Sequence, residues 1–274
     1  MRARSAIILT CVALMIQGTA WSADLRVDFR QMGFDNTALR LVGQNAEQLV
    51  RPTERGLLIR IPPKEGIVGP MGLAPRAMIR GDFEIVAEFE LLRCDRPREG
   101  PGVGIGLEVE FPNTAMGSIT IGRFAIPTEG DRFTWSAPSS AVGSAGHGPT
   151  RVPAGARTGK LRLVRTASLV RADYADGGGP FKLLREQEVG GADARIAWFG
   201  VETGTSSGRI EALLKSLTVG AGEWVETAET RAVPASGTDP MVLTITALNV
   251  VFLGLLTWKL WPARSRNPLK ERVG

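Results

Sequence analysis

The chain has 274 residues, of which 43% are hydrophobic and 22% charged, as expected for a globular protein with a buried core. Its formal net charge is +5, but Arg2 and Arg4 contribute two positive charges and residues 241–274 a net four. Residues 23–240 therefore carry a net charge of −1. Because the bulk of the chain is not basic, the sequence argues against nucleic acid as a partner.

Residues 1–22 have the three-part organisation of a secretory signal peptide. A short basic stretch precedes the apolar run 6–16, and small residues then allow cleavage after Ala20 or after Ser22. An uncleaved anchor is the alternative. We predict that the residues after this segment are exported.

Residues 23–220 alternate between apolar and polar residues with a period of two, which is typical of β-strands with one buried face. In the clearest run, 83–91, bulky apolar side chains alternate with glutamates and a valine. The run 102–110 repeats this alternation. About a dozen such runs, separated by turns rich in glycine and proline, predict a single all-β sandwich domain.

The C-terminal end of the sequence has the pattern of a membrane anchor. Residues 221–240, which include Trp224, have the composition of a flexible stalk. The segment 241–261 begins with 18 uncharged residues and approaches the roughly 20 that a helix needs to cross a bilayer. A basic tail follows at 262–274, so the positive-inside rule places the tail in the cytoplasm and the sandwich outside it. A buried core helix is the alternative for the apolar segment.

Two residues bear on whether copies of the chain associate. Removal of the signal peptide removes Cys11 and leaves Cys94, so we expect no internal disulfide, no cysteine-based metal site and no cofactor. Cys94 is expected to be a buried thiol, with an intermolecular disulfide as the alternative. Asn249 either links two membrane helices by a hydrogen bond or is a tolerated single amide, which leaves the oligomeric state open.

Several stretches of the sequence resemble known families. Three of them resemble the back half of concanavalin A-like lectin/glucanase jelly rolls: KLRLVRTASLVRADYADGGGPF at 160–181, IAWFGVET at 196–203 and LKSLTV at 214–219. Four motifs resemble the bacterial, membrane-anchored family of the domain of unknown function 1583: GLLIRIP at 56–62, RGDFEI at 80–85, LLRCDRP at 91–97 and GPGVGI at 100–105. The second resemblance covers about residues 25–220 and the terminal anchor. It implies a concanavalin A-like jelly-roll fold in the cell envelope and brings no catalytic or binding residues.

One pattern suggests catalysis. Glu88 and Glu90, with Glu84 on the same side of the strand, resemble the paired carboxyls of a retaining glycosidase, which lie about 5–5.5 Å apart. Alternate residues of a strand are about 6.5–7 Å apart, a gap that side chains can close. Glu108 and Glu110 form a second such pair. The Glu-x-Asp-x-Glu motif of jelly-roll glucanases is absent from the sequence, and solvated acidic side chains are the alternative explanation.

A strip of glycines suggests a binding surface. Gly102, Gly104 and Gly106 share one face of a predicted strand, next to Glu108 and Glu110. Glycine weakens a strand, so three in register indicate that something lies close above them. The sequence leaves two interpretations, a bound glycan or peptide and a bulky neighbouring side chain or loop.

Aromatic side chains are the other candidates for ligand contact. Trp135 stands beside a predicted long loop, 137–158, and Tyr174 stands at a strand end, so both are candidates for stacking on a sugar ring. Trp198 is expected in the core. His147 lies in the loop without a partner pattern, so we assign it neither a metal-binding nor a catalytic role.

The sequence therefore predicts a single-pass membrane protein with a concanavalin A-like sandwich outside the cytoplasm. The favoured function is binding or scaffolding at the cell envelope, with a glycan or an envelope protein as partner. One alternative is a membrane-tethered glycoside hydrolase that uses Glu88 and Glu90, and another is a purely structural envelope component. A groove with two acids about 5–9 Å apart would favour the enzyme, whereas exposed aromatic rings would favour a lectin and a flat face a scaffold.

Overall fold

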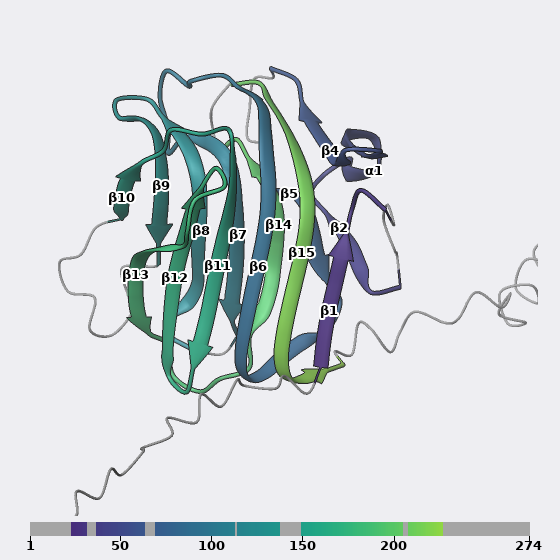
Figure 1. The fold of residues 1–274 in the computed structure, drawn as a ribbon, viewed down its shortest axis with the longest axis vertical. Helices are drawn as coiled ribbons and strands as arrows, with labels where there is room; N and C mark the ends of the chain where they lie inside the picture. The colour runs from purple at the N-terminus through teal and green to yellow at the C-terminus, as the bar shows by residue number, and fades with distance from the viewer. Residues whose placement is uncertain are drawn as a thin grey trace, which may run out of the picture. The chain divides into compact units, whose positions relative to one another are not determined.

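The computed structural model describes residues 23–31, 37–63, 69–112, 114–137, 149–204 and 208–226. Over these residues the chain forms a β-sandwich of two antiparallel sheets (Figure 1). The described part includes a single short helix, α1 (Ala46–Leu49). The predicted signal peptide at 1–22, membrane segment at 241–261 and basic tail at 262–274 lie outside the described residues. Within the described ranges, no helix has the length and apolar character needed to cross a membrane.

The first sheet, sheet A, has eight strands and is centred on two long neighbours, β6 (Met78–Cys94) and β15 (Ile210–Val225). From one edge inward, β6 is preceded by β13 (Lys182–Glu188), β12 (Leu169–Asp176) and β11 (Thr158–Thr166). On its other side, β15 pairs with β1 (Ala23–Asp28) and β4 (Gly56–Ile61), and β4 pairs with β3 (Val50–Thr53).

The second sheet, sheet B, has seven strands and carries the surface of functional interest. Its order is β10 (Thr150–Pro153), β9 (Gly130–Ser136), β8 (Gly117–Ile126), β7 (Val103–Phe111), β14 (Arg195–Glu202), β5 (Met71–Pro75) and β2 (Leu39–Val42). Strands β7 and β14 are distant in sequence and adjacent in space, a consequence of the jelly-roll connections.

The core lies between the two sheets and follows the predicted alternation. In β6 the inward residues include Phe83, Ile85 and Phe89, each fully buried. In β7, Ile105 and Leu107 are also fully buried. The residues that alternate with these, such as Glu84 and Glu88 in β6, point to the outer faces, as the period of two requires. The predicted all-β sandwich is therefore confirmed.

The sandwich extends further toward the C-terminus than the sequence suggested. Strand β15 continues to Val225, which pairs with Met78, so the first five residues of the predicted stalk belong to sheet A. Trp224 is partly buried against the core. The composition of this stretch predicted a flexible segment, but the long partner β6 supplies backbone hydrogen-bonding groups that keep it extended.

A buried arginine joins sheet A to the loop before β14. Arg165, 1% exposed, donates hydrogen bonds to the carbonyl oxygens of Gly81 and Ala192, and the bond from its Nε to Gly81 is 2.8 Å long. Its guanidinium lies 4.9 Å from the ring centroid of Phe83. Since the cation is desolvated, these contacts replace the hydrogen bonds that water would provide.

Candidate functional site

A groove of about 270 Å³ lies on the outer face of sheet B. Its residues come from five adjacent strands, β10, β9, β8, β7 and β14, and from the turns beside them. The lining residues are Pro101, Gly102, Glu108, Thr120, Phe124, Ile126, Thr134, Ser136, Pro149, Arg151 and Glu202. The groove thus combines carboxyl, hydroxyl and guanidinium groups with apolar surface.

Strand register assembles the polar part of this groove. Trp198, Glu108, Thr120 and Ser136 are consecutive cross-strand neighbours on β14, β7, β8 and β9. Cross-strand neighbours have their Cβ atoms about 4.5–5.5 Å apart and project from the same face. Pairing therefore lines up one carboxylate with two hydroxyl groups along the groove.

The carboxylate of Glu108 is held by two neighbouring side chains. Trp198 donates from Nε1 to Oε2 of Glu108 across 3.1 Å. Thr120 donates from Oγ1 to the same oxygen across 3.0 Å. Because both donors bind Oε2, they fix the orientation of the carboxylate and leave Oε1 for other partners.

Glu202, the second carboxyl of the groove, has a different environment. Burial raises its pKa above the usual glutamate value, and the negative charge of Glu108 raises it further. No hydrogen bond or ion pair links the Glu202 carboxyl to another side chain among the described residues. The groove therefore holds one hydrogen-bonded carboxylate and one carboxyl group whose pKa is raised.

Aromatic side chains occupy the space above most of the glycine strip. A Cβ atom on Gly106 would lie 2.8 Å from Cη2 of Trp198, and one on Gly104 would lie 2.7 Å from Cδ1 of Phe124. Of the three glycines only Gly102 lines the groove, where its φ of +123° is one that side chains rarely adopt. The indole of Trp198 thus explains Gly106, whereas Gly104 is explained first by the backbone of β8, where the carbonyl oxygen of Arg123 would lie 2.1 Å from an added Cβ.

Trp198 is buried, as predicted, but its indole lies on the Glu108 side of sheet B and not between the two sheets. A β-bulge interrupts the pairing of β14 with β7 between Ile196 and Trp198. The extra residue reverses the alternation, so Ile196 and Phe199 face the core while Trp198 faces the groove side. Trp198 is nevertheless only 3% exposed, because it lies over Gly106.

The two aromatic residues expected to contact a ligand do not line the groove. Trp135 is 4% exposed and belongs to the core, since it follows Phe133 by two residues on the inward face of β9. The ring of Tyr174 is stacked on that of Phe133 with centroids 4.5 Å apart. Phe124 is the aromatic residue that lines the groove, and it is 8% exposed.

Glu110 also projects from sheet B but is not part of the groove lining. Arg195 donates from Nε to Oε2 of Glu110 across 3.0 Å, and its Nη2 approaches the same oxygen. This ion pair connects β14 to β7 beside the groove. The role of Glu110 is therefore explained by its ion pair with Arg195 on the neighbouring strand.

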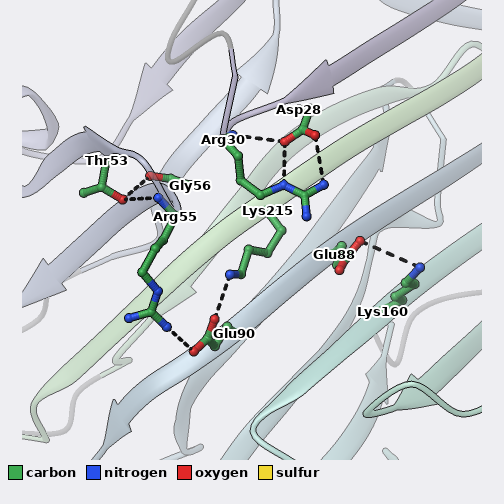
Figure 2. A network of polar contacts seen from close by, with 9 residues as sticks. All are labelled: Asp28, Arg30, Thr53, Arg55, Gly56, Glu88, Glu90, Lys160 and Lys215. Atoms are coloured by element: carbon green, nitrogen blue, oxygen red, sulfur yellow. Dashed lines mark hydrogen bonds and ion pairs between the residues drawn. The ribbon is translucent and has the colours of Figure 1, made fainter.

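Glu88 and Glu90 lie on the outer face of sheet A, on the other sheet from the groove. Figure 2 shows Glu90 between Arg55 and Lys215, at 2.6 and 2.7 Å, and Glu88 beside Lys160 at 3.7 Å. The hydrogen bond from Lys215 is the main reason why the pKa of Glu90 lies below its usual value. A carboxylate stabilised in this way is a poor proton donor, so the structure does not support a catalytic role for this pair.

The described part of the chain has no evident metal-binding site. No group of three or more histidine, cysteine, aspartate and glutamate side chains is placed there to hold an ion. The loop with His147 lies outside the described residues.

Sequence reasoning missed several residues of the groove, Glu202, Thr120 and Arg151 among them. Each stands at an outward position of its strand, and nothing in its local sequence distinguishes it from other outward residues. The only available signal for Glu202 is its outward place at the end of the predicted strand 195–202.

The family described as "Protein of unknown function (DUF1583) C domain" matches residues 12–235. The chain belongs to this family. No curated protein matches the chain significantly in sequence.

Among solved structures, peanut lectin with a 9mer peptide shares 10% sequence identity and a TM-score of 0.50, covering 75% of this chain and 100% of the lectin. An alginate lyase from Klebsiella pneumoniae shares 10% identity and a TM-score of 0.49, covering 74% of this chain and 100% of the lyase. The fold is therefore a lectin-like, all-β jelly roll.

Proposed function

We propose that this protein binds a glycan in the groove of sheet B. The observation that carries the proposal is the groove itself, in which Glu108, Thr120, Ser136 and Arg151 offer polar groups beside the apolar surface of Phe124. Small-molecule sites are concave and set a few converging polar groups against apolar surface, the combination that this groove offers to a sugar. The fold shared with peanut lectin is compatible with this function.

The charge of the groove favours neutral or amino sugars over anionic ones. Glu108 and Glu202 contribute two carboxyl groups, and the guanidinium of Arg151 is paired with Glu129. A polysaccharide rich in uronic acids would bring further negative charge against these carboxyls. We therefore expect neutral polysaccharides and chitosan to be retained better than alginate.

A retention assay with the full chain in detergent tests the proposal. The probes are amorphous cellulose, xylan, laminarin and chitosan, with alginate as the anionic comparison. Ser136 is exposed and lines the groove, so Ser136→Trp should block it and abolish retention. Thr158→Trp adds the same side chain at an exposed position of sheet A and should leave retention unchanged. Lack of retention on every probe, or retention that survives Ser136→Trp, would contradict the proposal.

The proposed setting is a membrane, with the sandwich outside the cytoplasm. The support is the apolar segment 241–261, the basic tail 262–274 and the signal-like residues 1–22. The full chain should remain with membranes at alkaline pH, and a chain ending at Asp239 should be released. External protease should digest the sandwich in intact cells. An envelope protein becomes the expected partner if no glycan is retained.

A further inference from the structure

We propose that the groove also hydrolyses the glycan it holds, with Glu202 as the general acid and Glu108 as the carboxylate that activates water. The inference rests on the proposed glycan binding, because it assigns a reaction to the same groove. It concerns a pair of carboxyl groups on sheet B, distinct from Glu88 and Glu90 on sheet A.

Strand pairing places the two carboxyls at separate points of one groove. Glu202 on β14 stands opposite Gly104 of β7, while Glu108 stands four residues further along β7. At a rise of about 3.3 Å per residue, their backbones are offset by about 13 Å along the strands. Both carboxyl groups line the same groove, and the charge of Glu108 acts on the Glu202 carboxyl, so the two groups face one bound ligand from separate points.

Glu108 and Glu202 have different environments, which assign them different roles in the proposed reaction. Glu108 accepts hydrogen bonds from Trp198 and Thr120 on one oxygen, so its carboxylate is held in a fixed orientation with Oε1 left for water. Glu202 is partly buried and faces the charge of Glu108, and both effects raise its pKa. Two carboxyl groups with such opposed environments are the arrangement from which acid and base roles are assigned.

The reaction needs only water as co-reactant. Oε1 of Glu108 accepts a proton from the water molecule as the water oxygen bonds to the anomeric carbon of the sugar. The bond between that carbon and the glycosidic oxygen breaks, and the leaving oxygen takes the proton of the Glu202 carboxyl. The products are a sugar with a new reducing end and a free alcohol, and proton exchange with solvent restores both glutamates.

Other charged clusters of the described residues offer no comparable chemistry. Asp173, fully buried, is paired with Arg162 and Arg171, so its carboxylate is neutralised. Glu90 is held ionised between two cations. Among the described carboxyl groups, Glu202 is the one that lines a groove and has a raised pKa.

The test uses the full chain in detergent with the neutral polysaccharides and chitosan of the retention assay. Both retention and the release of reducing ends are measured. Glu202→Gln and Glu108→Gln should lower release by a factor of about 10²–10⁴, the usual contribution of a general acid or base, and by more than they lower retention. Glu202→Asp should release more reducing ends than Glu202→Gln. The alkaline limb of its pH–rate profile should be displaced from that of the natural chain. Glu90→Gln, the matched control on sheet A, should release as the natural chain does.

The outcomes separate this inference from the proposed function. Retention without release by the natural chain would overturn the hydrolysis and leave glycan binding standing. Absence of both would overturn both proposals. Release that survives Glu202→Gln, in a variant whose thermal midpoint is not lowered, would overturn the assignment of the acid.

Discussion

Trp198 and Glu108 are opposite neighbours on β14 and β7, and the indole Nε1 donates to Oε2 of the carboxylate across 3.1 Å. The same indole lies over Gly106, so one side chain both covers this glycine and orients a carboxylate of the groove. A β-bulge beside Ile196 turns it to this face. Stability and the proposed chemistry therefore depend on a shared residue.

Trp198→Phe should separate these two effects. The variant keeps an aromatic ring over Gly106 and removes the donor to Glu108, while Thr120 still donates. We expect a loss of about 1–2 kcal/mol in the free energy of unfolding, measured by urea denaturation. Release of reducing ends should fall while retention stays. Trp224→Phe is the control, because Trp224 is partly buried and does not line the groove. Equal losses in both variants would argue against a role for the indole donor.

Gly106→Ala should force Trp198 out of position. The added Cβ would lie 2.8 Å from Cη2 and 3.2 Å from Cζ3 of the indole, closer than carbon atoms pack. Overpacking of this kind costs about 1–3 kcal/mol, which urea denaturation would detect. Gly178→Ala is the matched control, since nothing lies within 4 Å of the Cβ it would add. A Gly106 variant as stable as the Gly178 variant would show that the indole shifts freely.

Glu202 and Glu90 should influence stability with opposite signs. The pKa of Glu202 is raised in the folded protein, mainly by burial, so its stabilising contribution exists below the usual value of 4.5 and is lost as pH rises through the folded-state value. The pKa of Glu90 is lowered, mainly by Lys215, so its contribution exists above 4.5 and is lost as pH falls through the folded-state value.

Neutral variants of the two glutamates test these signs. At pH 7, Glu202→Gln should raise the free energy of unfolding and Glu90→Gln should lower it. Both differences should shrink in acid, Glu202 below pH 4.5 and Glu90 below its own depressed value. Urea denaturation from pH 3 to pH 8 provides the measurement. If both variants changed the free energy of unfolding in the same direction at pH 7, the opposite environments of Glu202 and Glu90 would be contradicted.

Arg165→Met should destabilise the sandwich. The substitution keeps an unbranched side chain of similar length and leaves the buried carbonyls of Gly81 and Ala192 without their donor. We expect a loss of about 2–4 kcal/mol, measured as a drop in the thermal midpoint. Arg26→Met, at a position with 74% side-chain exposure, should have little effect. If Arg165→Met and Arg26→Met lowered the thermal midpoint by similar amounts, the effect would come from removing positive charge in general.

Cys94 should be unreactive in the folded protein. Burial raises the pKa of its thiol to about 11, and Sγ lies 3.3 Å from the carbonyl oxygen of Val103. Iodoacetamide at pH 8 should modify Cys94 slowly in the native chain and rapidly in urea, as measured by mass spectrometry of its peptide. Fast native modification, or a reducible dimer through Cys94, would favour the intermolecular disulfide instead.

Local sequence was sufficient for the fold class and for the inward faces of the main strands. In 83–91 and 102–110, burial of alternate side chains such as Phe83 and Ile105 is a local property of an extended chain with one buried face. The same alternation set Glu108 outward and indicated that something bulky or bound lies over Gly106.

Tertiary structure decided which outward residues meet. Glu108 and Glu202 belong to strands that become neighbours only through the jelly-roll connections. The alternation of apolar and polar residues shows which way a side chain points, but it does not show which strands pair. One extra residue in β14 reversed the direction of Trp198, and a bulge depends on pairing with the next strand. The sequence by itself therefore determined an all-β sandwich with outward glutamates on the strands at 83–91 and 102–110. Pairing between distant strands decided that the groove lies on sheet B and joins Glu108 with Glu202.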